Sequence, residues 1–232
     1  MALEIIENKI VGTIEDLEAK LNGEIPITRE ELLVLVNSWG RKLGFTTKDS
    51  QNKDIYIGSC EATQSEQTEF VTKECYKLSK LNVTKITNMV DVFIYSLFEG
   101  DISEWNTSNV TNMDYMFYQA TNFNSNIGNW DVSNVTKIEF MFNNAEKFNQ
   151  NISSWKLDNI KSSYSMFNNA KAFKDRYNSG KPLSSYTDKI KEWFVLNRDR
   201  MNMIALKEKY GKEVDDFFFN ITNLTQQIKK DV

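Results

Sequence analysis

The sequence predicts an α+β protein built as a short solenoid of three to four coils, with helical segments at both ends. Three observations predict it: a 25-residue period in the middle of the chain, turn-forming residues within each unit, and helical periodicity outside it. The period places Trp105, Trp130 and Trp155 one step apart. We expect four regions, namely a helical hairpin over 1–45, a connector over 46–79, the repeat over 80–178 and a helical cap over 179–232.

The same 25-residue step relates several apolar columns. They are Val110, Val135 and Ile160; Met116, Met141 and Met166; Phe117, Phe142 and Phe167; Ala120, Ala145 and Ala170; and Phe123, Phe148 and Phe173. A degenerate copy begins near Ile86, and the third full copy decays after Ala170, as terminal repeats do where a stack must end. We expect the methionine and phenylalanine columns to form the core, with tryptophan at a corner of each coil.

Within a unit, the residues between the apolar positions are mainly asparagine, serine, threonine and glycine. Such residues favour turns and caps over a long helix because they hydrogen-bond to nearby backbone. We interpret 108–113 as a short strand, 114–120 as about a turn and a half of helix, and 121–129 as a return loop. The equivalent residues Asn109, Asn134 and Asn159 are expected to form a buried column of amides that bond to each other or to loop carbonyls.

Helix signals frame the repeat. Two capping boxes mark the N-terminal hairpin, Thr13 with Asp16 and Thr28 with Glu31. The connector is polar, and DIYIG is its one strand-like run. Apolar residues return to helical spacing after the repeat. The stripe that follows Gly211 either packs on the last coil as a cap or docks into a groove of a partner.

The composition excludes several kinds of site. The chain has 232 residues, 41% hydrophobic and 26% charged, with a net charge of −4, as is typical of a soluble globular protein. It has no histidine, the commonest general base and metal ligand. Its two cysteines, Cys60 and Cys75, are too few for a zinc site of the Cys/His type, and we expect inert thiols. The sequence therefore predicts no enzyme, no catalytic residue, no cofactor and no metal.

Charge and hydropathy also bear on partners and compartment. The mild acidity argues against nucleic-acid binding, and acidic neighbours weaken each local basic patch, at Lys207, Lys209, Lys212 or Lys229-Lys230. The first residues are acidic where a secretory signal is basic, and no stretch approaches transmembrane length. We expect a cytoplasmic protein of a bacterial host without membrane contact, or a cell-surface protein if a signal peptide was removed.

Two phrases of the repeat carry a family resemblance. WNTSNVTNMDYMFYQATNFNSNIGNW and WDVSNVTKIEFMFNNAEKFNQNISSW closely resemble the BspA-like surface-protein repeat, a leucine-rich-repeat relative also found in Mycoplasma lipoproteins. The resemblance covers roughly residues 80–178. It implies a right-handed, leucine-rich-repeat-like solenoid that serves adhesion or protein binding and is usually exported.

These observations predict a non-enzymatic protein that acts by occupying a partner's surface. One hypothesis is an inhibitor from a phage or mobile element that blocks a host nucleic-acid enzyme or defence complex, as anti-CRISPR proteins do. The alternative is an exported adhesin fragment of the BspA-like family. The expected partner is a protein, with a ribonucleoprotein or a nuclease among the candidates, and direct nucleic-acid contact is weakly supported.

Binding residues are expected where outward positions differ between copies, and in the helical ends. The outward positions are Asp114, Glu139 and Ser163-Tyr164, together with Tyr118, Asn143 and Asn168. The predicted partner-binding residues are Tyr118, Glu139, Tyr164, Phe217, Phe218 and Phe219. We also expect the segments 1–45 and 181–232 to contribute more to binding than the loops around Asn126 and Asn151.

Overall fold

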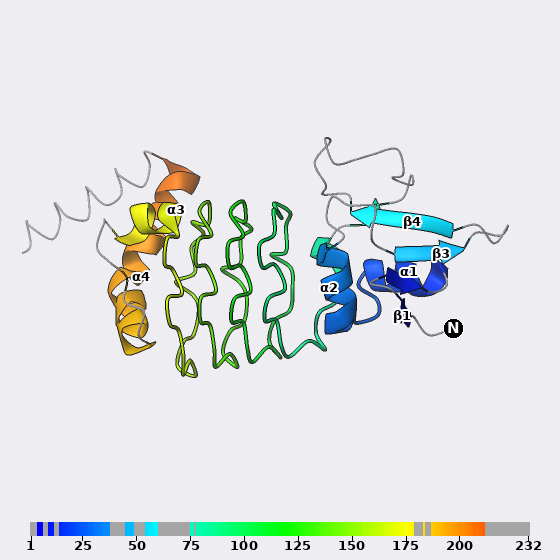
Figure 1. The fold of residues 1–232 in the computed structure, drawn as a ribbon. Helices are drawn as coiled ribbons and strands as arrows, with labels where there is room; N and C mark the ends of the chain where they lie inside the picture. The colour runs from blue at the N-terminus through cyan, green and yellow to red at the C-terminus, as the bar shows by residue number, and fades with distance from the viewer. Residues whose placement is uncertain are drawn as a thin grey trace, which may run out of the picture.

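The computed structural model describes residues 4–6, 9–11, 14–37, 45–48, 54–59, 75–76, 78–178, 183 and 187–211. Figure 1 shows three parts in chain order: a sheet with helices at the N-terminal end, a row of coils in the middle, and helix α4 (Thr187–Tyr210) at the far end. The coils run side by side, and their alignment positions the surface described below.

A five-stranded sheet and two helices, α1 (Ile14–Leu21) and α2 (Arg29–Asn37), form the N-terminal part. The strand order is β1 (Glu4–Ile6), β2 (Lys9–Val11), β3 (Phe45–Lys48), β4 (Asp54–Ser59) and β5 (Cys75–Tyr76). The β1/β2 and β3/β4 pairs are antiparallel, and the β2/β3 and β4/β5 pairs are parallel.

The sheet crosses the boundary that the sequence predicts at residue 45, between the helical hairpin and the connector. It joins the predicted hairpin to the predicted connector, because Ile10 of β2 lies opposite Phe45 of β3 and Thr47 of β3 lies opposite Ile55 of β4. The predicted strand-like run DIYIG is confirmed as part of β4, and the other strands have two to four residues each. Runs that short carry too little alternation to identify strands, and a single run does not show which distant strand it pairs with.

The second predicted capping box is confirmed at the start of α2. The Glu31 N–H donates to Thr28 Oγ1 at 3.2 Å, and the Thr28 N–H donates to Glu31 Oε2 at 2.8 Å. Glu31 is only 5% exposed, and Lys20 Nζ, 2.7 Å from its carboxylate, supplies the countercharge that burial requires. The first predicted box lies outside the described residues, because Thr13 is not among them.

Contacts from the start of α2 join the N-terminal part to the first coil. The Ile27 N–H donates to the Asn82 carbonyl at 2.9 Å, and the Arg29 guanidinium donates to the carbonyls of Asn88 and Val90 at 3.1 and 2.6 Å. In the next coil, the equivalent carbonyls belong to Asn112 and Asp114, and they accept N–H groups from the first coil. Arg29 therefore takes the place of a further coil and covers an edge that would otherwise be open to pairing.

Successive coils are joined by a ladder of backbone hydrogen bonds. Three parallel β-bridges link Asn88, Asn112, Lys137 and Ser162 in sequence. Beyond the bridge, every second N–H donates to the following coil: Met113 to Lys137, Tyr115 to Glu139, Phe117 to Met141 and Gln119 to Asn143, at 2.8–3.0 Å. The pattern repeats one coil further on, from Ile138, Phe140, Phe142 and Asn144. The register shifts by 24 or 25 residues at each step.

The predicted helical turn over 114–120 is wrong. Residues 114–119 form consecutive turns, in which Met116, Tyr118 and Ala120 donate to the carbonyls three residues back. Two residues of this stretch have positive φ, Tyr115 at 57° and Gln119 at 54°. A helix would use every N–H within its own segment, whereas here alternate N–H groups bond to the next coil, so the ladder opposes a helix.

The predicted phenylalanine columns are buried in the core. The rings of Phe93, Phe117, Phe142 and Phe167 follow one another with centroids 5.3, 5.6 and 5.6 Å apart. A second column, Phe98, Phe123, Phe148 and Phe173, has spacings of 6.5, 5.9 and 5.7 Å. All eight rings are at most 1% exposed. This near-parallel, offset stacking across coils is a favourable arrangement for aromatic rings.

The tryptophans and asparagines tie each coil to the one before it. The indole N–H groups of Trp105, Trp130 and Trp155 donate to the carbonyls of Leu78, Ile102 and Ile127 at 2.7, 3.1 and 3.0 Å. The side-chain amides of Asn109, Asn134 and Asn159 donate to Thr84, Ser108 and Ser133 at 2.7–2.8 Å. The expected bonds to loop carbonyls are confirmed, but the three asparagines are exposed rather than buried.

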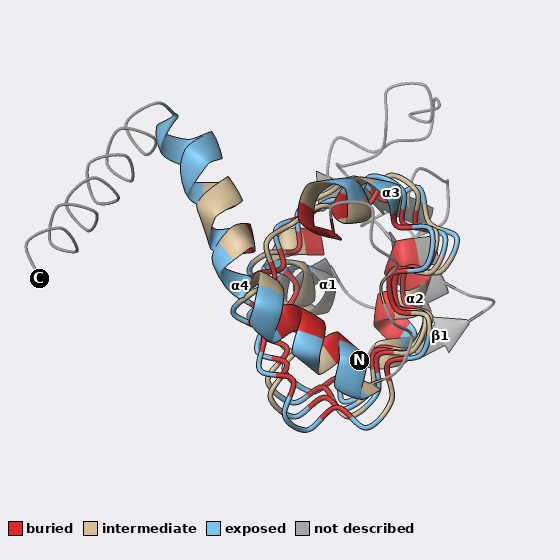
Figure 2. Cartoon of the chain, turned by 90° about the vertical axis from the view of Figure 1, so that its left-hand side faces the viewer, coloured by how far each residue is buried: buried red, intermediate tan, exposed pale blue. Residues whose placement is uncertain are grey.

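Helix α4 covers the end of the last coil. The rings of Trp193 and Phe194 lie 6.2 and 6.4 Å from Phe167, and the Trp193 indole donates to Asn178 Oδ1 at 3.0 Å. Asn178 ends a short helical stretch, α3 (Lys171–Phe173) with the π-helical η2 (Lys174–Asn178). Figure 2 shows buried residues along the part of α4 that crosses the end of the coils, and exposed ones on its outer side. None of the helices within the described ranges has the length and apolar character of a membrane span.

Candidate interaction surface

One side of the stack is built from residues 88–95, 112–119, 137–144 and 162–169, and we call it the ladder wall. Each of its segments has two non-glycine residues with φ between 51° and 63°. They are Asp91 and Tyr95, Tyr115 and Gln119, Phe140 and Asn144, and Ser165 and Asn169. None of these eight residues is buried, so the wall displays their side chains at its surface.

Aromatic side chains from all four segments touch across the ladder wall, and we call them the aromatic row: Tyr95, Tyr118, Tyr115, Phe140 and Tyr164. Neighbouring rings have centroids 5.6, 5.7, 4.8 and 5.2 Å apart in that order. The two terminal rings, Tyr95 and Tyr164, are 63% and 50% exposed, and the three between them are partly exposed. The ladder wall thus presents a continuous aromatic band, a feature typical of interaction sites.

Three acidic residues lie on the ladder wall near the centre of this row, since Asp114 precedes Tyr115, Glu139 precedes Phe140, and the Asp91 N–H donates to the Asp114 carbonyl. Burial raises the pKa of Asp91, against the opposing charge of Arg29, and burial likewise raises the pKa of Asp114. The pKa of the Tyr115 hydroxyl is raised first by partial burial and then by the negative charges of Glu139, Asp114 and Asp91. All three carboxylates therefore lie close enough to Tyr115 for their fields to act on its phenol.

Two of these carboxylates also hold the coils in register. Asp114 Oδ1 accepts the N–H of Glu139 at 2.7 Å, and Glu139 Oε1 accepts the hydroxyl of Ser162. The Glu139 charge contributes to raising the pKa of Asp114. Like charges are thus held side by side on a partly buried surface, which is unfavourable unless a cation offsets them.

Three of the predicted binding residues meet on the ladder wall. Tyr118 and Tyr164 both contact Phe140, with ring centroids 6.4 and 5.2 Å away, and Glu139 is the residue before it. Phe217, Phe218 and Phe219 lie outside the described residues. Cys60 lies outside them too.

Two of the positions predicted to face outward are buried instead. Asn143 is 4% exposed and Ser163 is 1% exposed. Asn143 turns inward because its amide interacts within the wall, donating to the Ser165 carbonyl at 3.4 Å and accepting from Asn144 Nδ2 at 2.6 Å. Equivalent positions of a repeat can thus differ in exposure, since Tyr118, one coil earlier, is partly exposed.

The sequence-based prediction missed Tyr95, Tyr115 and Phe140. Tyr115 and Phe140 stand 25 residues apart, so the period itself pairs them. Each precedes a buried methionine, Met116 or Met141. Their exposure depends on the turns observed here, whereas the sequence-based prediction assumed a helical turn over 114–120. Tyr95 belongs to the degenerate first copy, where the step is 24 residues, and only the ladder shows that it lies beside Tyr118.

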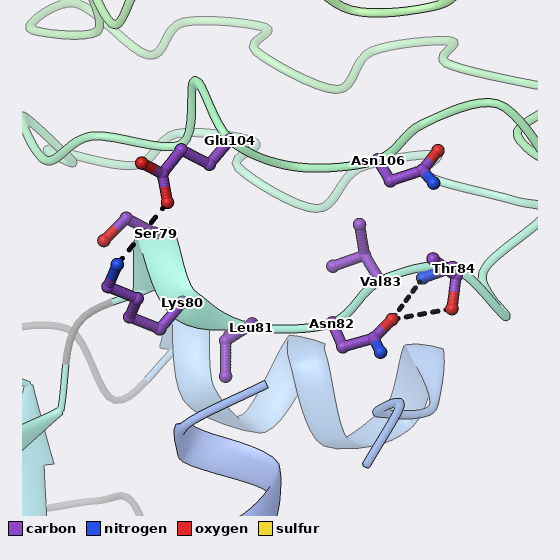
Figure 3. A pocket seen from close by; sticks show the side chains of 8 residues that line it. All are labelled: Ser79, Lys80, Leu81, Asn82, Val83, Thr84, Glu104 and Asn106. Carbon is purple, nitrogen blue, oxygen red and sulfur yellow. Dashed lines mark hydrogen bonds and ion pairs between the residues drawn. The ribbon is translucent and has the colours of Figure 1, made fainter. Parts of the chain in front are cut away.

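Two surface hollows lie near the junction of the N-terminal part and the first coil. Figure 3 shows the smaller, about 230 Å³, lined by residues 79–84 with Glu104 and Asn106. Its polar groups are partly engaged with one another, since Lys80 pairs with Glu104 at 3.6 Å and the Asn82 side chain accepts from Thr84. The larger, about 560 Å³, lies between 25–30 and 85–88. Two charged residues that line the larger hollow are likewise engaged, since Lys20 pairs with Glu31 and Arg29 donates to the carbonyls of Asn88 and Val90.

Within the described residues, no cluster of three or more cysteine, aspartate or glutamate side chains is suited to hold a metal ion.

The stacked coils and the ladder wall define a repeat protein that displays an aromatic and acidic surface. A family model described as "Mycoplasma protein of unknown function, DUF285" matches residues 61–179, just over half of the 232 residues. The chain belongs to this family. Comparisons with curated proteins and with solved structures found no match.

Proposed function

We propose that this chain is a non-enzymatic binding protein whose aromatic row docks a partner protein. The observation that carries the proposal is the continuity of exposed and partly exposed rings across all four segments of the ladder wall. Tyrosine supplies large contact area together with a hydroxyl at low conformational cost, and it is enriched among residues that dominate binding energy.

The backbone positions of two of these rings support a role beyond folding. Tyr115 and Phe140 have φ of 57° and 54°, a region that bulky side chains rarely occupy and that costs about 1–3 kcal/mol per residue. The equivalent residues in the outer copies are Asp91 and Ser165, so the fold accepts small polar residues there. Rings retained at a strained and partly exposed position are better explained by binding than by packing.

The finer family assignment is part of the proposal. The repeat motif and the match to a Mycoplasma family both favour a BspA-like surface protein with a right-handed, leucine-rich-repeat-like solenoid. In that setting the ladder wall would face a partner outside the cell. The inhibitor of a host nuclease or defence complex stays a sequence-based prediction, because no described feature favours it over the surface protein.

Site-specific photo-cross-linking in the native host tests the proposal. A photoreactive phenylalanine analogue replaces Tyr118 or Tyr164 on the row, Lys156 on an exposed corner, or Val195 on the outer face of α4. We expect one partner protein to be captured from the two row positions and not from Lys156. Capture from Val195 alone, or equally from all four positions, would contradict the assignment of the ladder wall.

A further inference from the structure

We infer that the ladder wall selects a positively charged segment, whose lysine or arginine side chains lie over the aromatic row and between the carboxylates of Asp91, Asp114 and Glu139. This inference rests on the proposed function and specifies its partner. It commits to a protein segment of basic character rather than to an apolar or an acidic one.

The first argument is the cost of covering the carboxylates. Asp114 and Glu139 are already partly buried, and burial raises the pKa of Asp114. An apolar partner docked on the neighbouring rings would remove more water from both charges without compensation, which strongly opposes binding. An acidic partner would add repulsion. A basic partner removes the same water but supplies the missing countercharge.

The second argument concerns the cations already present. Arg29 acts on Asp91, but its guanidinium is engaged with the Asn88 and Val90 carbonyls. Lys137 acts on Asp114 from an exposed position. Three acidic groups thus face two basic ones, and the whole chain carries a net charge of −4. The negative charge of the ladder wall and the net negative charge of the chain would therefore both attract a basic segment.

The third argument is the chemistry of the rings. Cations are attracted to the faces of tyrosine and phenylalanine within about 6 Å of the ring centre. Arginine adds a planar group that stacks on rings and binds a carboxylate through two hydrogen bonds. Asp114 accepts the Glu139 N–H and a side-chain bond from Asn112, and Glu139 accepts the Ser162 hydroxyl. A carboxylate has about four acceptor positions, so both retain capacity.

The size of the row indicates a short segment. Parallel segments of a ladder lie about 4.8 Å apart, so the row crosses about 14 Å over three steps. An extended chain covers that distance in about four or five residues, at about 3.3 Å each. Two or three basic side chains within such a stretch could reach the carboxylates together.

Binding of a labelled peptide of alternating arginine and glycine, with a glutamate–glycine peptide as the opposite probe, tests the inference by fluorescence anisotropy. The test variant is Asp114→Asn with Glu139→Gln, and the matched control is Asp158→Asn with Glu192→Gln, which removes the same charge from exposed sites elsewhere. We expect the test variant to bind the arginine peptide about fivefold more weakly than wild type. The control variant should bind nearly as wild type.

A second pair of substitutions, Tyr118→Leu with Tyr164→Leu, keeps apolar bulk but removes the tyrosine rings. It should also weaken binding of the arginine peptide. Thermal melts of each variant confirm that the comparison is between folded proteins. Equal losses in the test and control variants, or equal binding of the two probe peptides, would overturn the inference. If that happened while Tyr118 still cross-linked a partner, the proposed function would stand and the basic character would fail. If cross-linking failed as well, both would fall.

Discussion

Replacing Phe142 by alanine tests whether the stacked rings stabilise the fold. The Phe142 side chain is fully buried in the central coil, and its ring lies against four other rings. Their centroids are 4.0 Å away for Phe148, 5.6 Å for Phe117, 5.6 Å for Phe167 and 6.2 Å for Trp155. The substitution therefore removes both buried apolar area and several aromatic contacts.

The expected loss lies near the upper end of the usual range. Truncating a buried phenylalanine to alanine costs about 3–5 kcal/mol, and the cost is greatest where neighbours cannot close the cavity. Here the neighbouring coils are held by bonds such as Phe142 N–H to Met166 O at 2.9 Å, so collapse is restricted. We expect a loss of about 4–5 kcal/mol, or roughly 8–20 °C in melting temperature for a chain of this size.

Phe140→Ala is the matched control, because it is the same residue type two positions away with its ring on the surface. We expect that variant to lose about 1 kcal/mol, the scale of its ring contacts. Urea unfolding followed by circular dichroism measures the free energy of unfolding of both variants. The dependence of that free energy on urea concentration reports whether each variant exposes the same surface on unfolding as wild type. A Phe142→Ala melt within about 2 °C of wild type, or equal losses in the two variants, would refute the assignment of the column to the core.

The remaining predictions concern single contacts and charges. Trp130→Phe removes the indole bond to the Ile102 carbonyl, which still accepts the Trp105 N–H, and should cost about 0.5–1.5 kcal/mol in urea unfolding. Arg29→Gln uncovers two edge carbonyls and should accelerate amide hydrogen exchange in the first coil more than in the last. Asp114 has its folded pKa raised above the ordinary 3.8, so its contribution to stability is present below that pH and lost as pH rises through the raised value. Asp114→Asn should therefore be more stable than wild type at pH 7, with the difference vanishing near pH 3. A chelator should leave the melting temperature unchanged.

The core of the coils could be predicted because its signal repeats. A residue such as Phe117 recurs at Phe142 and Phe167, and coincidence over three copies fixes which side chains stack. The capping box of Thr28 and Glu31 was readable for another reason, since both of its hydrogen bonds join residues three apart. Local or periodic interactions leave a pattern in a single sequence.

The turns of the ladder wall could not be predicted in this way. Asparagine, serine and tyrosine at 115–119 and its equivalents are compatible with a helical turn or with a series of turns, and bonds to the next coil decide between them. The sheet was missed because its pairings, such as Ile10 with Phe45, connect distant short runs. The aromatic row was found only in part, because the exposure of Tyr115 and Phe140 depends on those unpredicted turns.

The most direct test of the central claim compares two surfaces for binding of the partner captured by cross-linking. Tyr118→Ala with Tyr164→Ala removes two rings of the row, and Val195→Ala with Leu196→Ala removes the two most exposed apolar side chains of α4, which are 69% and 72% exposed. Isothermal titration calorimetry should show at least about tenfold weaker binding for the tyrosine pair and near wild-type binding for the α4 pair. Undiminished affinity of the tyrosine pair, with loss in the α4 pair, would move the binding site from the ladder wall to the terminal helix.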